Sequence, residues 1–223
     1  MGDVRFLDNF SPFAETVSYY GMFNSLSQAL LKITSPGVPD FYQGTELWGL
    51  SLVDPDNRRA VDFGLRTAML AELKKLESEI GPAELSKKLM AEREDGRVKL
   101  FMTWMALNFR RMNRELFEEG EYIPLEAIGT GAESVCAFAR KLGDRTAITA
   151  VPRLLVRRAT KPPLEREAWD GTLLIIPFAK EGERYRNVCT GEVVIVGISG
   201  VVASINAFEL FGPFPVALLD RIY

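Results

Sequence analysis

The spacing of apolar residues changes near residue 120 and divides the sequence into two parts. In the first part, apolar side chains recur every three or four residues, the spacing that gathers them on one face of a helix. The stripes, in chain order, are Phe13, Val17 and Tyr20; Met22, Leu26, Ala29, Leu30 and Ile33; Leu65, Met69, Leu73, Leu76 and Ile80; and Val98, Met102, Met105, Phe109 and Met112. The pattern predicts a mostly helical region over residues 1–119.

Proline and glycine indicate where these helices begin and end. Ser11-Pro12 is a cap and first-turn pair that predicts a helix start, and Gly21 predicts a break or kink after it. Ser35-Pro36-Gly37 is expected to end the second stripe, and Gly81-Pro82 the third. A further short helix is predicted over residues 83–93.

One segment of the first part does not follow the helical spacing. Residues 38–42 are predicted as a short strand, and they run into a long polar loop. The loop combines acidic, amide and guanidinium groups, which together can contact several hydroxyls or a carboxylate. The candidate binding residues are Tyr42, Gln43, Glu46, Asp54, Asp56, Asn57, Arg58 and Arg59.

The second part, residues 120–223, alternates short apolar runs with turn residues such as Gly143-Asp144 and Thr190-Gly191. Lys161-Pro162-Pro163 is expected to be a loop, and residues 203–211 a short helical insertion. Strands are predicted at 122–128, 135–141, 146–153, 173–178, 185–189, 192–196 and 215–219. Short strands at regular intervals predict an antiparallel sandwich.

The predicted fold class is therefore α+β, but a lone strand at 38–42 needs an explanation. An isolated strand cannot satisfy its backbone hydrogen-bonding groups. The first part is best interpreted as the tail of a (β/α)8 barrel, consisting of its last strand and the flanking helices. The predicted domains are the C-terminal part of a barrel over residues 1–119 and a C-terminal antiparallel β-sandwich over residues 120–223.

The amino-acid composition excludes several kinds of catalytic and metal site. The sequence of 223 residues contains no histidine, which excludes Ser-His-Asp, Cys-His and His-ligated metal sites. A net charge of −3 does not suggest a nucleic-acid partner, and no apolar run is long enough for a membrane span. Cys136 and Cys189 are too few for a disulfide scaffold, so we expect two buried thiols in a cytoplasmic protein. We expect no cofactor and no metal.

Several segments resemble the α-amylase family of glycoside enzymes. The run PGVPDFYQGTE, residues 36–46, is similar to the segment at the eighth barrel strand of that family. YQGTELW and DPDNRR are the most specific matches, and the run SLVDPDNRRAVDF resembles the intramolecular transglucosylases of the family. The resemblance extends through FLDNFSPF, GMFNSLSQALLKITS, DGRVKLFMTWMALNFRR and ELFEEGEYIPL into the second part.

The resemblance implies an activity whose catalytic groups lie elsewhere. Such transglucosylases convert the reducing-end α-1,4 link of a maltooligosaccharide into an α,α-1,1 (trehalose) link by a retaining double displacement. The resemblance places their three catalytic carboxylates on barrel strands four, five and seven, the last in a motif with a His-Asp pair. We therefore expect no catalytic residue in this chain and no activity from it alone. Asp40, Glu46 and Asp56 are not assigned catalytic roles.

The loop residues also have structural interpretations. Residues 54–57 are typical of a turn, and Arg58 and Arg59 of a solvated surface pair, although the resemblance makes sugar contact or loop bracing equally plausible. Tyr42 suits stacking on a sugar ring or packing in a core, and core packing is favoured for Trp48. Glu46 is expected to brace the loop through an arginine rather than bind a hydroxyl.

Three functions remain open. The chain is part of such a transglucosylase, part of another α-amylase-family hydrolase or transglucosylase, or a non-catalytic carbohydrate-binding sandwich. The third function would need an exposed aromatic platform from Tyr122, Trp169 or Tyr185. The expected partner is a maltooligosaccharide, with no nucleic acid and no membrane. Self-association of the isolated chain is predicted through barrel-facing residues that include Phe6, Phe10, Phe13, Leu26, Leu30, Phe41 and Met69.

Overall fold

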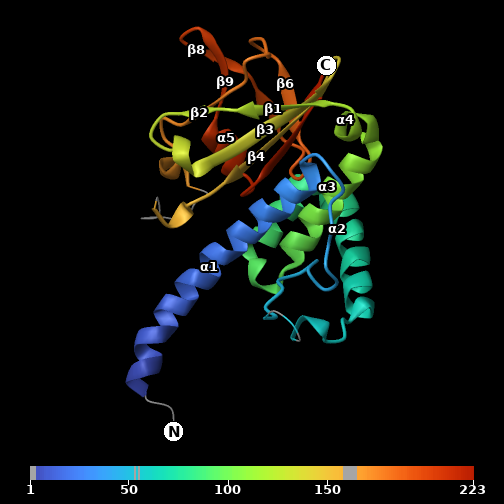
Figure 1. The fold of residues 1–223 in the computed structure, drawn as a ribbon, viewed down its shortest axis with the longest axis vertical. Helices are drawn as coiled ribbons and strands as arrows, with labels where there is room; N and C mark the ends of the chain where they lie inside the picture. The colour runs from blue at the N-terminus through green and yellow to red at the C-terminus, as the bar shows by residue number, and fades with distance from the viewer. Residues whose placement is uncertain (1–3, 53, 55, 158–164) are drawn as a thin grey trace.

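The computed structural model describes residues 4–52, 54, 56–157 and 165–223, and it places the long helices at one end of the molecule and the antiparallel sheets, together with the short helices, at the other (Figure 1). The predicted loop at Lys161-Pro162-Pro163 lies outside the described residues. The helices are α1 (Val4–Thr34), α2 (Phe63–Ala91), α3 (Arg97–Met112), α4 (Arg114–Glu118) and α5 (Ala207–Phe211). The 3-10 turns are η1 (Asp56–Arg58), η2 (Arg93–Asp95), η3 (Ala132–Ser134), η4 (Leu155–Arg157) and η5 (Arg166–Ala168). No described helix is both long and apolar enough to cross a membrane.

The strands form two antiparallel sheets. The larger sheet has the order β1-β3-β4-β10-β6-β7, and the smaller one the order β2-β5-β9-β8. In the larger sheet the bounds are β1 (Glu121–Leu125), β3 (Val135–Leu142), β4 (Arg145–Pro152), β10 (Ala217–Ile222), β6 (Arg184–Asn187) and β7 (Val193–Ile195). In the smaller sheet they are β2 (Ala127–Ile128), β5 (Leu173–Ile175), β9 (Val202–Asn206) and β8 (Gly197–Ser199). The fold is thus α+β with antiparallel sheets, as predicted.

The core is continuous from the helices into the sheets. The second half of α1 packs on α3 and β4, where the Ser27 hydroxyl donates to the Pro152 carbonyl at 2.9 Å. Between the sheets, the ring of Trp169 lies 4.6 Å from that of Phe211, and neither residue is exposed. Buried side chains from both ends of the molecule belong to this cluster, among them Phe23, Leu30, Leu73, Phe101, Ile148, Leu174, Ile205, Phe214 and Leu218.

The helix boundaries differ from the prediction at two points. Helix α1 begins before Ser11-Pro12 and continues through Gly21 without a break. Its second half is fixed by packing against α3 and β4, which outweighs the weak helix preference of one glycine. The predicted stop at Gly81-Pro82 is confirmed, because Gly81 adopts a non-helical φ of +77° that divides α2 into two helices, and the second of these corresponds to the helix expected over 83–93.

The predicted strand at residues 38–42 is wrong, whereas the second part follows its prediction closely. Residues 38–42 form no strand and pair with no described strand, and Val38 is 94% exposed. A segment without a paired neighbour forms no ladder. The predicted run 122–128 is divided into β1 and β2, and the expected helical insertion at 203–211 is strand β9 followed by α5. Strand β8 was not predicted.

A glycine turn connects the kinked helix α2 to α3. After η2, Gly96 adopts φ +81°, where the backbone N–H donates to the Arg93 carbonyl at 3.2 Å. A Cβ built on Gly96 would lie 3.0 Å from the Trp48 backbone nitrogen. The turn therefore requires glycine for its backbone conformation and for the close approach of residues 47–48.

We predict that Gly96→Ala lowers the free energy of unfolding by about 2–4 kcal/mol, because alanine adds both left-handed strain and a close contact. Gly143, at φ +60° with no atom near its absent Cβ, is the matched control. Gly143→Ala should lower the free energy of unfolding only by the left-handed backbone strain, about 1–2 kcal/mol. Urea denaturation of both variants measures the difference, and equal losses would contradict the packing argument.

The two thiols differ in environment. Cys189 is fully buried, and burial raises its pKa to about 12, whereas Cys136 is half-buried on β3. The expectation of two buried thiols holds for Cys189 and only in part for Cys136. Both cysteines are free.

We predict that a thiol reagent at pH 8 labels Cys136 but not Cys189 in the folded chain. A pKa near 12 leaves roughly one Cys189 in ten thousand as thiolate at that pH, and burial also blocks the reagent. Absorbance of released thionitrobenzoate counts the reacting thiols before and after unfolding in guanidinium. Cys136→Ser should show no folded-state labelling and one thiol after unfolding. Rapid labelling of Cys189 in that folded variant would contradict its burial.

Candidate functional site

The polar loop begins in a segment that α3 holds against the end of α1. The Arg110 guanidinium on α3 donates to the carbonyls of Ile33 at 2.6 Å and Ser35 at 3.1 Å, and also to that of Gly37. The Ile33 carbonyl belongs to the last turn of α1, where a helix leaves its acceptors unsatisfied, and the other two carbonyls come directly after the helix. Arg110 thereby fixes the direction in which the chain enters residues 38–42.

The middle of the loop is anchored on the turn between α2 and α3. The Trp48 indole Nε1 donates to the Arg93 carbonyl at 2.7 Å, and the Lys99 ammonium donates to the Leu47 carbonyl at 3.2 Å. The same ammonium lies 5.9 Å from the centre of the Trp48 ring. Together with the close approach of Gly96, these contacts form the Trp48 anchor, in which residues 47–48 are bound from three sides.

The Lys99 side chain is buried, with 8% of the residue exposed. Burial lowers the pKa of its ammonium, the positive charge of Lys32 lowers it further, and the carboxylate of Glu46 acts in the opposite direction. No carboxylate of the described residues lies within ion-pair distance of Lys99. A lysine in this position acts mainly as a hydrogen-bond donor to the loop.

An ion pair connects the start of the loop to its end. Arg66 on α2 donates from Nε to Glu46 Oε2 at 2.9 Å, and from Nη2 to the Gly44 carbonyl at 3.1 Å. Asp62 caps the same helix by accepting from the Leu65 amide at 2.8 Å. Both members of the Glu46–Arg66 pair are less than one-third exposed. The expectation that Glu46 braces the loop through an arginine is confirmed.

The tip of the loop is a turn closed by its own charges. Asp56 Oδ2 accepts from the Leu52 amide at 2.8 Å and also pairs with Arg59. Arg58 donates from Nε to Asp54 Oδ1 at 2.8 Å, and both side chains are more than half exposed. Exposed pairs of this kind contribute little to stability, so the tip holds its shape chiefly through the Asp56–Leu52 turn bond.

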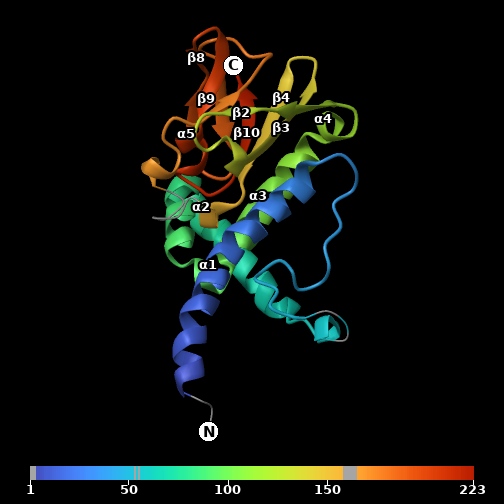
Figure 2. The ribbon, with the colours of Figure 1, turned by 60° about the vertical axis from the view of Figure 1, so that its left-hand side comes forward.

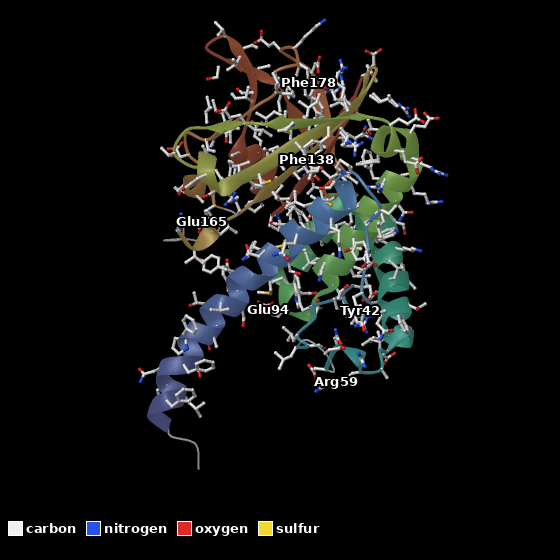
Figure 3. The ribbon with its side chains drawn as sticks, in the orientation of Figure 1. Tyr42, Arg59, Glu94, Phe138, Glu165 and Phe178 are labelled. Carbon is white, nitrogen blue, oxygen red and sulfur yellow. The ribbon has the colours of Figure 1, made fainter. Side chains whose placement is uncertain are left out.

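The loop lines a cavity of about 500 Å³ that is open to solvent on one side. Four of the predicted residues line it: Tyr42, Gln43, Asn57 and Arg59. The Asn57 side-chain oxygen is shielded from solvent and, in the part of the chain that the structure describes, accepts no hydrogen bond. Figure 3 labels Tyr42 and Arg59 at the end of the helical part that is distant from the sheets. An aromatic ring, two side-chain amides and a guanidinium therefore line the same cavity.

The other four predicted residues do not line this cavity. Glu46, Asp54 and Asp56 each form an ion pair with an arginine, and Arg58 is the partner of Asp54. The oxygens of these carboxylates are thus already engaged by guanidinium groups. Among the described residues, no group of three or more acidic or cysteine side chains is arranged to hold a metal ion. The loop is suited to hydrogen bonding with hydroxyl groups rather than to acid–base chemistry.

Sequence reasoning missed the residues that hold the loop in place. Arg66 also lines the cavity, and Arg93, Gly96 and Lys99 support the Trp48 anchor. Asp62 preceding an apolar stripe is a helix-cap signal that indicates the start of α2. The contacts of Arg66 and Lys99 join residues 20 and 52 positions apart, and local sequence patterns carry no signal for them.

Comparison with known proteins finds relatives along most of this chain, although no protein-family model matches it. A protein of Mycobacterium tuberculosis named as a maltooligosyl trehalose synthase is 36% identical over 200 residues, which are 89% of this chain and 20% of that protein. The solved structure of maltooligosyltrehalose synthase from Arthrobacter ramosus is 32% identical with a TM-score of 0.71, covering 95% of this chain and 24% of that one.

A more distant likeness concerns the fold. An α-amylase structure from Anoxybacillus is 16% identical, with a TM-score of 0.52, over 88% of this chain and 32% of that one. At this identity the likeness shows the fold alone. The two synthases, in contrast, match most of the chain at 32% to 36% identity, and the chain spans about a fifth to a quarter of their length. The chain is therefore homologous to one segment of the maltooligosyltrehalose synthases.

Proposed function

We propose that residues 42–66 hold part of a maltooligosaccharide in an intramolecular transglucosylase that forms an α,α-1,1 (trehalose) link. The observation that carries this proposal is the convergence of Tyr42, Gln43, Asn57 and Arg59 on one cavity. The names of the two synthases supply the substrate class. Because the chain spans only part of those proteins, the activity is proposed for a protein that also contains the catalytic carboxylates.

The cavity residues suit a sugar chain in distinct ways. Tyr42 is 49% exposed, so its ring is accessible to the apolar face of a pyranose. Asn57 lines the same cavity, and its amide is a group that can hydrogen-bond to hydroxyls. Gln43 offers both a donor and an acceptor. Arg59 pairs with Asp56 but remains 79% exposed at its side chain, which leaves further N–H groups for hydroxyls.

The predicted site residues outside the cavity act as supports in this proposal. Glu46 fixes the loop through Arg66, Asp56 closes the turn at Leu52, and the exposed Asp54–Arg58 pair lies at the tip. We further infer that the helical part is the tail of a (β/α)8 barrel, with residues 1–119 and 120–223 as separate domains of a cytoplasmic enzyme. The antiparallel sheets and the α-amylase-like fold support this organisation.

The alternatives receive less support. A carbohydrate-binding sandwich would need an aromatic platform, but Trp169 and Tyr185 are fully buried, and Tyr122 packs on Phe138 with 4.7 Å between ring centres. Another α-amylase-family hydrolase or transglucosylase would share the loop position. The 32% to 36% identity to synthases, against 16% to an α-amylase, favours the trehalose-forming reaction.

We predict that the isolated chain forms no trehalose-type end from maltopentaose. Retaining transfer needs a nucleophile and an acid/base carboxylate about 5 Å apart on opposite sides of the scissile bond, and the loop carboxylates are held by arginines. Reducing-sugar assay and chromatography of the products check this. Loss of reducing ends at a rate proportional to the concentration of purified chain would overturn the prediction.

The proposal itself is tested in a chimaera in which this chain replaces the matched segment of the Arthrobacter ramosus enzyme. We predict that Arg59→Ala lowers kcat/KM on maltopentaose about 10- to 100-fold, because a charged hydrogen bond to the substrate contributes about 1.5–3 kcal/mol. Arg58→Ala is the matched control, since Arg58 is adjacent, carries the same charge and lies outside the cavity. It should change kcat/KM by less than about twofold.

Thermal melting of both chimaeric variants excludes an effect on folding. Equal losses of activity in the two variants would show that the cavity does not distinguish the arginines. A chimaera that folds but leaves maltopentaose unchanged would contradict the proposed function as a whole.

A further inference from the structure

We propose that Arg66 is a positioning residue that sets the distance between the two walls of the loop cavity. The inference rests on the proposed function, because the spacing of the walls decides how the cavity holds a sugar. Residues 42–44 are here called the entry wall and residues 59–62 the exit wall, and all of them line the cavity. Arg66 lines the same cavity from the first turn of α2.

The two walls come from separate stretches of the chain and are not joined by a strand ladder. Figures 1 and 2 show the chain between α1 and α2 leaving the helices and turning back into the start of α2. The walls approach each other directly at Gly44, where an added Cβ would lie 3.1 Å from Cγ2 of Val61. A contact between a glycine and one valine side chain involves few atoms, so it is too weak to fix the spacing by itself.

The guanidinium of Arg66 contacts both walls and a third point of the loop. Nη2 donates to the Gly44 carbonyl of the entry wall at 3.1 Å, and Nη1 donates to the Asp62 carbonyl of the exit wall at 3.1 Å. Nε donates to Glu46 Oε2 at 2.9 Å. Each nitrogen of one rigid plane therefore has a different acceptor, and the plane fixes the separation of the three acceptors.

Arg66 is itself held in a defined position. Asp62 is the N-cap of α2, and its carboxylate accepts from the Leu65 amide at 2.8 Å, which joins the exit wall to the helix that carries Arg66. The side chains of Arg66 and Glu46 are 19% and 29% exposed, so water competes less for their contacts than at the exposed pairs of the loop tip. The Trp48 anchor, two residues after Glu46, connects this point to the turn between α2 and α3.

These contacts bear on the spacing of the cavity more than on the stability of the chain. The α2 residues Leu73 and Leu85 are fully buried in the core, and they do not depend on the Arg66 guanidinium. A sugar that hydrogen-bonds to both Gln43 and Arg59 needs one particular spacing of the walls. A changed spacing weakens the binding of substrate and transition state alike, which raises KM and leaves kcat unchanged. A loss of folded protein would instead lower the apparent kcat and leave KM unchanged.

Lysine at position 66 separates geometry from charge. Arg66→Lys keeps the positive charge beside Glu46, but one ammonium on a flexible stem does not reproduce three contacts in a plane. In the chimaera described above, we expect Arg66→Lys to raise KM on maltopentaose about tenfold, on the order of one lost hydrogen bond, and to change kcat by less than about twofold. The matched control is Arg114→Lys, because Arg114 Nε donates to Glu118 Oε1 at 2.7 Å on the exposed side of α4. It should leave both constants unchanged.

Hydrogen exchange of the chain itself tests the contacts without any substrate. At short labelling times, Arg66→Lys should speed the exchange of backbone amides in both walls about tenfold, because local opening loses the hydrogen bonds that oppose it. The amides of β3 and β4 should exchange as in the natural chain. Arg114→Lys should speed exchange in neither wall.

The measurements distinguish a failure of this inference from a failure of the proposed function. A chimaera with the natural loop that leaves maltopentaose unchanged would contradict the proposed function, and the exchange data would then decide the role of Arg66. An active chimaera in which Arg66→Lys leaves KM unchanged would overturn the positioning role. Faster exchange in only one wall would show that Arg66 does not join the two. Thermal melting of each variant verifies that it remains folded.

Discussion

The hydrogen bond from the Trp48 indole to the Arg93 carbonyl is the constraint on which the candidate site depends. The described residues between 38 and 62 contain no strand and only the short turn η1, so their position is not set by a ladder. The Trp48 anchor replaces the ladder with one side-chain hydrogen bond, one lysine contact and one glycine turn. Without it, the contacts of Arg66 with Glu46 and Gly44 would be the main connection between the middle of the loop and the helices, and a partly exposed ion pair contributes too little to order so many residues.

Most charged side chains of the loop form ion pairs with nearby side chains. Asp54 with Arg58, Asp56 with Arg59 and Glu46 with Arg66 form three nearly independent pairs. The region around the cavity therefore carries little net charge, although its sequence is densely charged. A cavity of this kind suits a neutral, hydroxyl-rich ligand better than an anion or a cation, because it lacks the field that would draw an ion into it.

The sequence predicted the sheets better than the region before residue 120, for physical reasons. Strands β3 and β4 are adjacent in sequence and are joined by the turn at Gly143-Asp144, so local patterns determine them. Residues 38–42 have the composition of a strand, but a strand exists only with a partner. In the site, Tyr42, Gln43, Asn57 and Arg59 were found from side-chain chemistry. Arg66, Gly96 and Lys99 were missed because their partners are distant in sequence. The division of the loop residues into cavity-lining and supporting groups likewise depended on long-range contacts.

The position of β10 has a consequence for how the chain acquires its structure. Residues 217–222 follow every other strand of the larger sheet in sequence, yet they lie between β4 and β6 at its centre. Until they arrive, β1, β3 and β4 form one ribbon, and β6 and β7 another, with two open edges facing each other. During synthesis on a ribosome, the other strands of this sheet must therefore wait as two incomplete ribbons that are prone to pair with other chains. The larger sheet closes only when its final strand has left the exit tunnel.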